Sequence, residues 1–167
     1  MDYKIDVENF TLPNGQTVEV SKRIYSFQKW RGDEIKNDYG GKAVLDNEGS
    51  PLFAELVILR LLEKEGWSGI WVDTYGKKFR MGLPEKSDPI SLPPEKQSLL
   101  DNISKQAGGF KGCWDVFAWK DNEYLFAESK RIGKDSIRDT QINWLFTALQ
   151  VGIPIKSFLL VEWNIQN

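Results

Sequence analysis

The sequence predicts an α/β or α+β domain in which helices cover a mixed central β-sheet. Three patterns support this class: an alternating β-hairpin at residues 112–130, an amphipathic helix followed by an apolar strand at 157–163, and an apolar run with helix signals after residue 50. A strand, a helix and a second strand in this order form a βαβ unit. The last strand should therefore run parallel to the second strand of the hairpin.

Composition limits the chemistry that the chain can perform. Its 167 residues are 41% hydrophobic and carry a net charge of −2, which suits one domain whose contacts with nucleic acid are local. There is no histidine, and the single cysteine, Cys113, expected in a strand, has no disulfide partner. Histidine-dependent triads and cysteine or histidine zinc sites are thus excluded, which leaves carboxylates, lysine and a hard cation such as Mg²⁺. Without a long apolar run or a signal peptide, we expect a cytoplasmic protein and no membrane span.

The first part of the chain is expected to pack on the rest within a single domain. Residues 1–49 are interpreted as a hairpin with an irregular extension, and residues 50–167 as the core. The hairpin lies at 8–20 around an Asn-Gly dipeptide, the strongest short turn signal. The mixed stretch that follows suggests a short helix near 22–30 and a turn at Gly40-Gly41.

The core begins with the clearest helix signal of the sequence. Ser50-Pro51 predicts its N-cap and first position, and Gly66 predicts its end. Residues 69–75 are rich in β-formers and predict a buried strand. Four prolines within 83–94 indicate a loop, which leads into an amphipathic helix at 95–107 that Gly-Gly terminates.

The hairpin at 112–130 carries the most informative residues. A turn at Asp121-Asn122 places Asp115 opposite Glu128, with Lys130 two residues further along on the same side. Carboxylates held about 5 Å apart repel by roughly 3 kcal/mol at an effective dielectric near 20, so we expect a cation between them. Four aromatic residues share this face, as expected for a site beside a core. The plainer alternative is an ordinary Glu128–Lys130 ion pair with Asp115 in solvent.

Other polar residues are candidate site residues because of their positions. Glu55 lies on the apolar face of the first helix, one turn beyond the cap, where the helix dipole no longer explains an acid. The tetrapeptide at 136–139 resembles a capping box, and Gln141 lies in the first turn of the helix that follows. Positive charge gathers around this helix start and could hold a phosphate backbone. The residues concerned are Arg131, Lys134 and Arg138.

Three further features have open interpretations. The basic groups of Arg131, Lys134 and Arg138 could equally be part of a solvated loop, and the same holds for the cluster of Lys77, Lys78 and Arg80. Asp73 in the predicted strand is an additional candidate ligand. Among the seven tryptophans, core packing is favoured over base stacking for Trp71, Trp114, Trp144 and Trp163.

Taken with these residues, the chain resembles the PD-(D/E)XK nuclease superfamily, most closely its VRR-NUC and Holliday-junction-resolvase-like branches. The resemblance covers about residues 50–163. It rests on PLFAELVILRLL, GCWDVF, FAESK and RDTQINWLFTALQVGIP, followed by an apolar strand. Trp114 departs from the pattern, since the motif name has proline at that position.

The resemblance implies a restriction-endonuclease-like fold and a set of site residues. The catalytic set at the motif positions is Asp115, Glu128, Lys130 and Gln141. One Mg²⁺ or Mn²⁺ would be bound by Asp115, Glu128 and the backbone carbonyl of Ser129, and by Glu55 directly or through water. Lys130 would orient the attacking water or neutralise the phosphorane, and Gln141 would position the nucleophile or the lysine.

The leading hypothesis is therefore a metal-dependent endonuclease or exonuclease that hydrolyses DNA phosphodiester bonds. Because no separate sequence-reading module is visible, we expect recognition of DNA structure such as branches, flaps or ends. Arg131, Lys134 and Arg138 would contact the DNA, and the resemblance suggests a homodimer. The competing hypothesis is a catalytically inactive nuclease-fold module that binds DNA or a protein partner. An enzyme acting on small molecules is less favoured because no Gly-rich cofactor loop is present.

Overall fold

The computed structural model describes residues 1–166 and contains a large mixed sheet with three flanking helices. The strands are β1 (Lys4–Thr11), β2 (Thr17–Lys29), β3 (Leu45–Asn47), β4 (Ser50–Leu52), β5 (Ser68–Asp73), β6 (Lys78–Arg80), β7 (Val116–Lys120), β8 (Glu123–Arg131) and β9 (Phe158–Gln166). The helices are α1 (Ala54–Lys64), α2 (Pro94–Ala107) and α3 (Asp139–Gln150), with a short 3-10 turn at Ile155–Ser157. The strand order is β4-β3-β2-β9-β8-β7-β5-β6, and β1 also pairs with β2. The predicted α/β class with a mixed sheet is confirmed.

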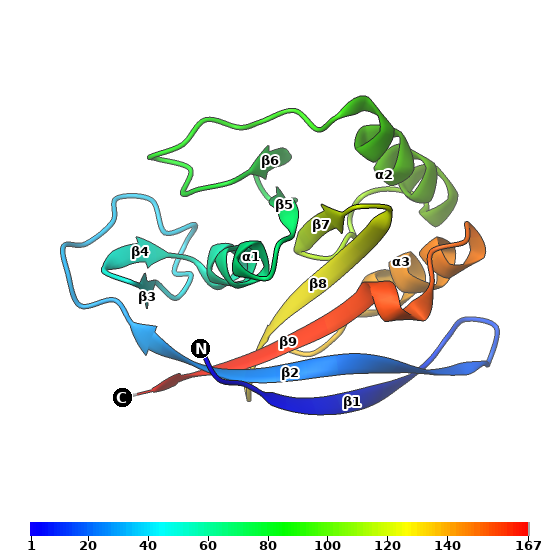
Figure 1. The fold of residues 1–167 in the computed structure, drawn as a ribbon, viewed down its shortest axis with the longest axis horizontal. Coiled ribbons are helices and arrows are strands. Elements are labelled where there is room, and N and C mark those ends of the chain that lie inside the picture. Colours follow the sequence, from blue (N-terminus) through cyan, green and yellow to red (C-terminus); the bar gives the residue numbers. More distant parts are fainter. Residues whose placement is uncertain (167) are drawn as a thin grey trace.

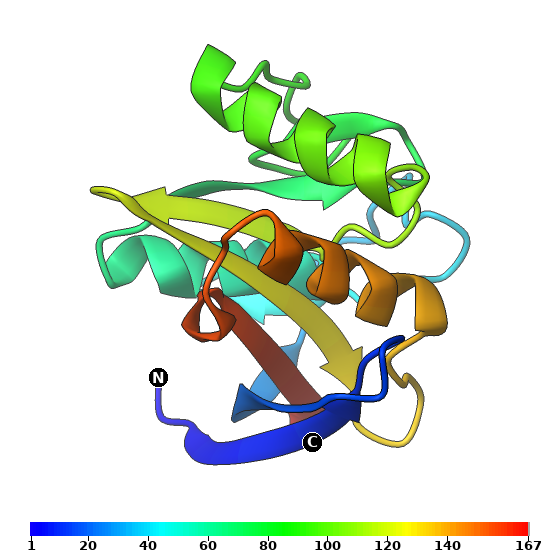
Figure 2. The ribbon, with the colours of Figure 1, turned by 90° about the vertical axis from the view of Figure 1, so that its right-hand side faces the viewer.

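The helices divide between the two faces of the sheet. α1 covers one face, and α2 and α3 cover the other, as the two perpendicular views show (Figures 1 and 2). The core on the α1 side includes Phe27, Trp71 and Trp163, and the core on the α3 side includes Trp114 and Trp144. The four tryptophans expected in the core are therefore buried. None of the helices in residues 1–166 is both long and apolar enough to cross a membrane.

The N-terminal hairpin is confirmed and is longer than predicted. β1 pairs with β2 around a turn in which Gly15 has a φ of +86°. The helix expected near 22–30 is wrong, because β2 continues as a strand to Lys29. Its residues from Ser21 onward form a parallel ladder with β9, and this long-range pairing overrides the weak local helical pattern. The turn at Gly40-Gly41 is confirmed, with positive φ at both glycines.

The first helix begins later than the sequence signals suggested. Ser50-Pro51, predicted as its N-cap and first position, instead lies in β4, which forms a tight hairpin with β3. The turn residues Glu48 and Gly49 both have positive φ, as a type I′ hairpin turn requires. Proline is tolerated there because β4 is an edge strand. Phe53 occupies the N-cap, whereas Gly66 ends α1 with a φ of +94°, as predicted.

The central hairpin has the predicted register. Phe117 pairs with Phe126 and Lys120 with Glu123, around a turn in which Asp121 has a φ of +54°. β9 runs parallel to β8, as the βαβ order predicted. Cys113 is buried but precedes β7, so its expected place in a strand is wrong.

The start of α3 also differs from the sequence prediction. The N-cap is Arg138, so the expected capping box at 136–139 is wrong. The Gln141 side chain caps the helix start instead, because its Oε1 accepts a hydrogen bond from the Arg138 N–H at 2.9 Å. The helix therefore begins where Gln141 can reach back to its own first turn.

Candidate functional site

Side chains replace the backbone ladder at the end of the β7–β8 hairpin. The ladder stops at the Val116–Ala127 pair, just before Asp115 and Glu128. The Asp115 N–H donates to Glu128 Oε1 at 3.0 Å, and the Ser129 N–H donates to Asp115 Oδ2 at 2.9 Å. Each carboxylate thus caps the backbone of the opposite strand. The carbonyl of Asp115 accepts from the Val72 N–H of β5, which fixes the residue between its two neighbours.

Glu128, Lys130 and Gln141 form one hydrogen-bonded cluster on the α3 side of the sheet. Glu128 and Lys130 are two residues apart on β8 and are 2% and 9% exposed. Lys130 Nζ lies 3.1 Å from Glu128 Oε2 and 3.0 Å from Gln141 Oε1. The Gln141 amide nitrogen donates to Glu128 Oε2. The predicted lysine, acid and glutamine are therefore in direct mutual contact.

Two residues before β7 hold the start of α3 against this cluster. A Cβ added at Gly112 would lie 1.9 Å from the Thr140 carbonyl oxygen, so only glycine permits this close backbone approach. The Trp114 indole N–H donates to the Gln141 carbonyl at 3.0 Å. Trp114, which departs from the proline of the motif, thus anchors the turn that carries Gln141.

Glu55 reaches the site from the opposite face of the sheet. It lines a cavity of about 230 Å³ together with Asp115 and Lys42. Glu55 is 7% exposed; its Oε1 accepts from Lys42 Nζ at 2.8 Å, and its Oε2 is buried with no hydrogen-bond partner within residues 1–166. The lysine belongs to the loop that follows the Gly40-Gly41 turn.

The site consequently extends over both faces of the sheet. The sequence placed Asp115, Glu128 and Lys130 on a single face, but Asp115 shares its cavity with Glu55 on the α1 side. One ammonium group lies against a carboxylate on each face of the sheet. Lys130 contacts Glu128, and Lys42 contacts Glu55.

Burial dominates the electrostatics of the carboxylates. It raises the pKa of Asp115 well above the usual range, and repulsion from Glu128 and Glu55 raises it further. Burial also raises the pKa of Glu128, although Lys130 opposes the shift. For Lys42, burial lowers the pKa, but the attraction of Glu55, Asp115 and Asp135 together makes the net shift upward. Two buried carboxyl groups, Glu55 and Glu128, and the half-buried Asp115 thus outnumber the two ammonium groups of Lys42 and Lys130.

The donors at this site are hard oxygen atoms, which Mg²⁺ and Mn²⁺ prefer. Residues 1–166 contain no group of three or more His, Cys, Asp or Glu side chains already arranged to hold a metal ion. Glu55 Oε2 is nevertheless buried without a donor, and the Asp115 carboxylate lines the same cavity, so this pair fits a cation. Glu128 has donors on both oxygens and would have to release one of them. Ser129 lines the adjacent cavity, and its hydroxyl accepts from the Trp163 indole N–H.

The predicted phosphate-binding residues lie around different cavities. Arg131 and Lys134 line a cavity of about 340 Å³ that also contains Lys42 and Glu55. The Arg131 guanidinium packs 5.5 Å from the centre of the Trp163 ring. Arg138 lines another cavity, of about 690 Å³, instead. The loop between β8 and α3 therefore presents positive charge at two separate places.

Asp73 and the second basic cluster are explained mainly by structure. The Asp73 carboxylate is 1% exposed and accepts from the Tyr39 hydroxyl at 2.6 Å and from Arg80 Nε at 3.0 Å. It also accepts from the Gly76 N–H and so fixes the β5–β6 turn. Arg80 contacts Asp73, whereas Lys77 and Lys78 line the 690 Å³ cavity.

Sequence reasoning missed Lys42 and Gly112 as site residues. Lys42 lies in a stretch with no hydrophobic periodicity, so nothing in the pattern brings it toward Glu55. The only sequence signal for Gly112 was its position close to Asp115. Comparisons of the chain with protein-family models, with curated proteins and with solved structures gave no match.

Proposed function

We propose that the chain is a Mg²⁺- or Mn²⁺-dependent nuclease with a restriction-endonuclease-like fold that hydrolyses DNA phosphodiester bonds. The observation that carries this proposal is the convergence of the motif residues from separate elements. Glu128 and Lys130 of β8 contact Gln141 of α3, and Asp115 connects them to Glu55 of α1. A buried lysine bridged to a carboxylate and a glutamine at the end of two strands is suited to act on a phosphate.

The residues of this site have distinct roles in the proposed reaction. Asp115 and Glu55 would hold the metal ion, and Glu128 would join them after releasing a donor. When bound, the ion supplies Lewis-acid activation of water and of the scissile phosphate. Lys130 donates hydrogen bonds to the charge that develops on the phosphate, which is worth most in a site with little water. Gln141 keeps the Lys130 ammonium in place through its Oε1.

DNA cleavage by the purified chain tests this function directly. We expect cutting with Mg²⁺ or Mn²⁺, loss of activity in EDTA, and loss of activity in Lys130→Ala. The matched control is Lys156→Ala, because Lys156 is 71% exposed and pairs with Glu123 at the turn end of the hairpin. If Lys130→Ala cuts as well as Lys156→Ala, the role given to Lys130 is wrong.

Recognition of DNA structure rather than base sequence is part of the proposal. Labelled duplex, single-stranded, flap and four-way-junction substrates of several sequences would be compared. We expect cleavage to follow the type of structure, and cleavage of one short sequence in plain duplex would contradict this. A homodimer with two sites related by a two-fold axis would suit a branched substrate, and sedimentation measures it.

A binding module without catalytic activity is the second candidate. It is favoured by the hydrogen bonding of Glu128, whose two oxygens both accept from groups of the chain itself. Calorimetry with Mn²⁺ separates the candidates, since a binding module has no need of an ion beside Asp115 and Glu55. Binding that disappears in Asp115→Asn supports the nuclease, and absence of binding supports the module.

A further inference from the structure

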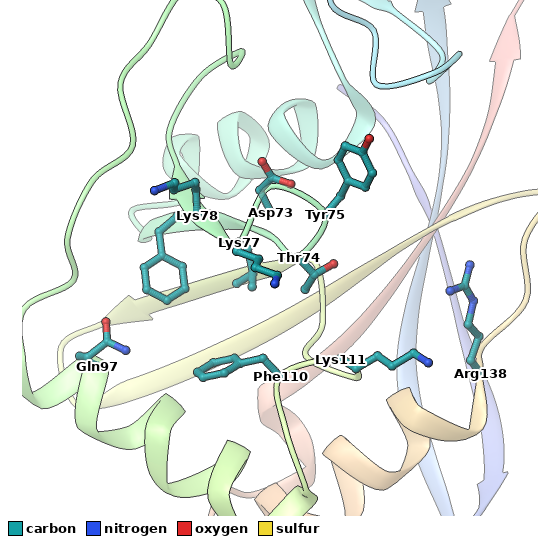
Figure 3. A pocket seen from close by; sticks show the side chains of 11 residues that line it. Asp73, Thr74, Tyr75, Lys77, Lys78, Gln97, Phe110, Lys111 and Arg138 are labelled. Carbon is teal, nitrogen blue, oxygen red and sulfur yellow. The ribbon is translucent and has the colours of Figure 1, made fainter.

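A large cavity lies beside the site on the α3 side of the sheet. Its volume is about 690 Å³, within the range of pockets that hold small organic ligands. Its walls come from the end of β5, the β5–β6 turn, α2, the segment before β7 and the start of α3 (Figure 3). It shares residues 72–75 with the smaller cavity that contains Glu55 and Asp115. The large cavity therefore adjoins the proposed reaction centre.

The side chains around this cavity combine positive charge with aromatic surface. The cations are Lys77, Lys78, Lys111 and Arg138, and the aromatic residues are Tyr75, Phe79 and Phe110. None of the four cations forms an ion pair with a carboxylate within residues 1–166. In Figure 3 the Lys111 side chain extends toward Arg138, while the Phe110 ring turns toward Gln97.

The negative charge at the cavity is already neutralised. Asp73 is the one carboxylate among the described lining residues, and it is held by Arg80 and by the Tyr39 hydroxyl. The lining thus carries four uncompensated positive charges in a chain whose net charge is −2. This local excess selects an anionic ligand.

We propose that this cavity binds a single-stranded segment of DNA, with an unpaired base against Phe110 and Phe79 and with phosphates on Lys77 and Lys111. Aromatic side chains offer stacking surfaces that a base can use only once it is unstacked from a duplex. Lysines at the rim neutralise the backbone on either side of that base. This inference rests on the proposed function, and it assigns to the substrate an unpaired strand next to the bond that is cut.

The position of Arg138 connects this cavity to the reaction centre. The side chain of Arg138 lines the cavity, and its N–H donates to the same Gln141 oxygen that Lys130 contacts. A strand that leaves the cavity past Arg138 therefore passes within one helical turn of the Lys130 cluster. This arrangement favours flaps, ends and branch points, where paired DNA opens into single strands.

Binding of oligonucleotides in EDTA tests the proposal without any cleavage. The probe is a short fluorescein-labelled oligothymidine, followed by fluorescence anisotropy at several salt concentrations. We expect Lys77→Ala/Lys111→Ala to weaken binding about tenfold and to reduce the slope of log K against log salt by about 1.4, or about 0.7 per lost phosphate contact. Phe110→Leu keeps an apolar contact with Trp144 but lacks a stacking surface, and should weaken binding about tenfold.

The control is Lys105→Ala, an exposed lysine of α2 outside the cavity lining. The proposal is overturned if the parent does not bind oligothymidine, or if the cavity variants bind as well as Lys105→Ala. If the cavity variants lose as much affinity for a blunt DNA duplex as for oligothymidine, the proposal is also overturned. If the parent binds oligouridine more tightly than oligothymidine, the cavity is assigned to RNA instead. Because the assay contains no metal ion, a chain that binds in EDTA but never cuts would refute the nuclease and leave the cavity assignment intact.

Discussion

The contact between Lys42 and Glu55 yields a quantitative prediction about metal binding. Replacing Lys42 by Met removes the ammonium group that lies 2.8 Å from Glu55 Oε1. At this 2.8 Å separation and an effective dielectric near 20, the attraction is about 6 kcal/mol before desolvation is subtracted. Removing one partner of a buried pair costs about 3–5 kcal/mol, and the 33% exposure of the Lys42 side chain reduces this to about 2–3 kcal/mol. Without metal, Lys42→Met should lose that amount of unfolding free energy.

Added metal should return part of this loss. With Lys42 gone, both Glu55 oxygens become available to Mg²⁺, and a tenfold tighter dissociation constant adds about 1.4 kcal/mol of stability at saturation. Urea unfolding in EDTA and in saturating Mg²⁺ measures both quantities for parent and variant. A double variant, Lys42→Met/Glu55→Gln, should recover much of the stability in EDTA, because no buried charge is left alone.

Lys22 provides a matched control for this experiment. Its side chain is 11% exposed and its ion pairs are with Glu8 and Glu162, not with Glu55 or Asp115; Glu162 lies opposite Lys130 in the β8–β9 ladder, on the other side of the sheet from Lys42 and Glu55. Lys22→Met should lose stability in EDTA but should respond to Mg²⁺ like the parent. If Lys42→Met and Lys22→Met gain the same increment from Mg²⁺, the ammonium of Lys42 does not compete with a metal ion and the reasoning is refuted.

Three further predictions concern the same site. The parent without metal should lose stability as the pH rises from about 4 toward the raised pKa of Asp115, because the unfolded carboxyl releases its proton first. Asp115→Asn should remove this fall and raise the melting temperature at pH 7; a pH profile like that of the parent would contradict it. Glu128→Gln should lower the melting temperature by an amount equivalent to about 1–3 kcal/mol, since its amide would face the donors of Lys130 and Gln141; unchanged stability would show that these contacts are dispensable. Gly112→Ala should cost about 1–3 kcal/mol in thermal unfolding and reduce cleavage, because the added Cβ displaces the first turn of α3; normal activity would mean that this turn is free to shift.

The parts predicted correctly depend on short-range geometry. The register of the β7–β8 hairpin follows from one turn and an alternation of period two, so Asp115 and Glu128 could be paired by counting. The end of α1 was signalled by Gly66, whose positive φ is needed locally. Both inferences required no knowledge of the remaining chain.

The errors arose where distant residues decide the structure. Residues 22–28 form a strand because β9, far along the sequence, pairs with them. Ser50-Pro51 satisfies the rules for a helix start and for an edge strand alike, and the contact with β3 selects the strand. The same limit applies to Lys42, since only the folded loop brings its ammonium to Glu55. The need for glycine at position 112 also depends on a distant residue, because a side chain there would collide with the Thr140 carbonyl at the start of α3.

The position of β9 in the sheet has a consequence for the order of folding. β9 follows every other strand in the sequence, yet it lies between β2 and β8 and pairs with both in parallel (Figure 1). During synthesis β2 and β8 cannot complete their pairing until β9 has been made. Contacts between residues so far apart in the sequence slow folding. Until β9 is added, β8 has an unpaired edge along Glu128 and Lys130, and the loop to Asp135 is not fixed by Trp163. A ribosome-bound chain that lacks β9 therefore cannot yet hold Glu128 and Lys130 in their final places, so the proposed site would be complete only once synthesis has passed the strand.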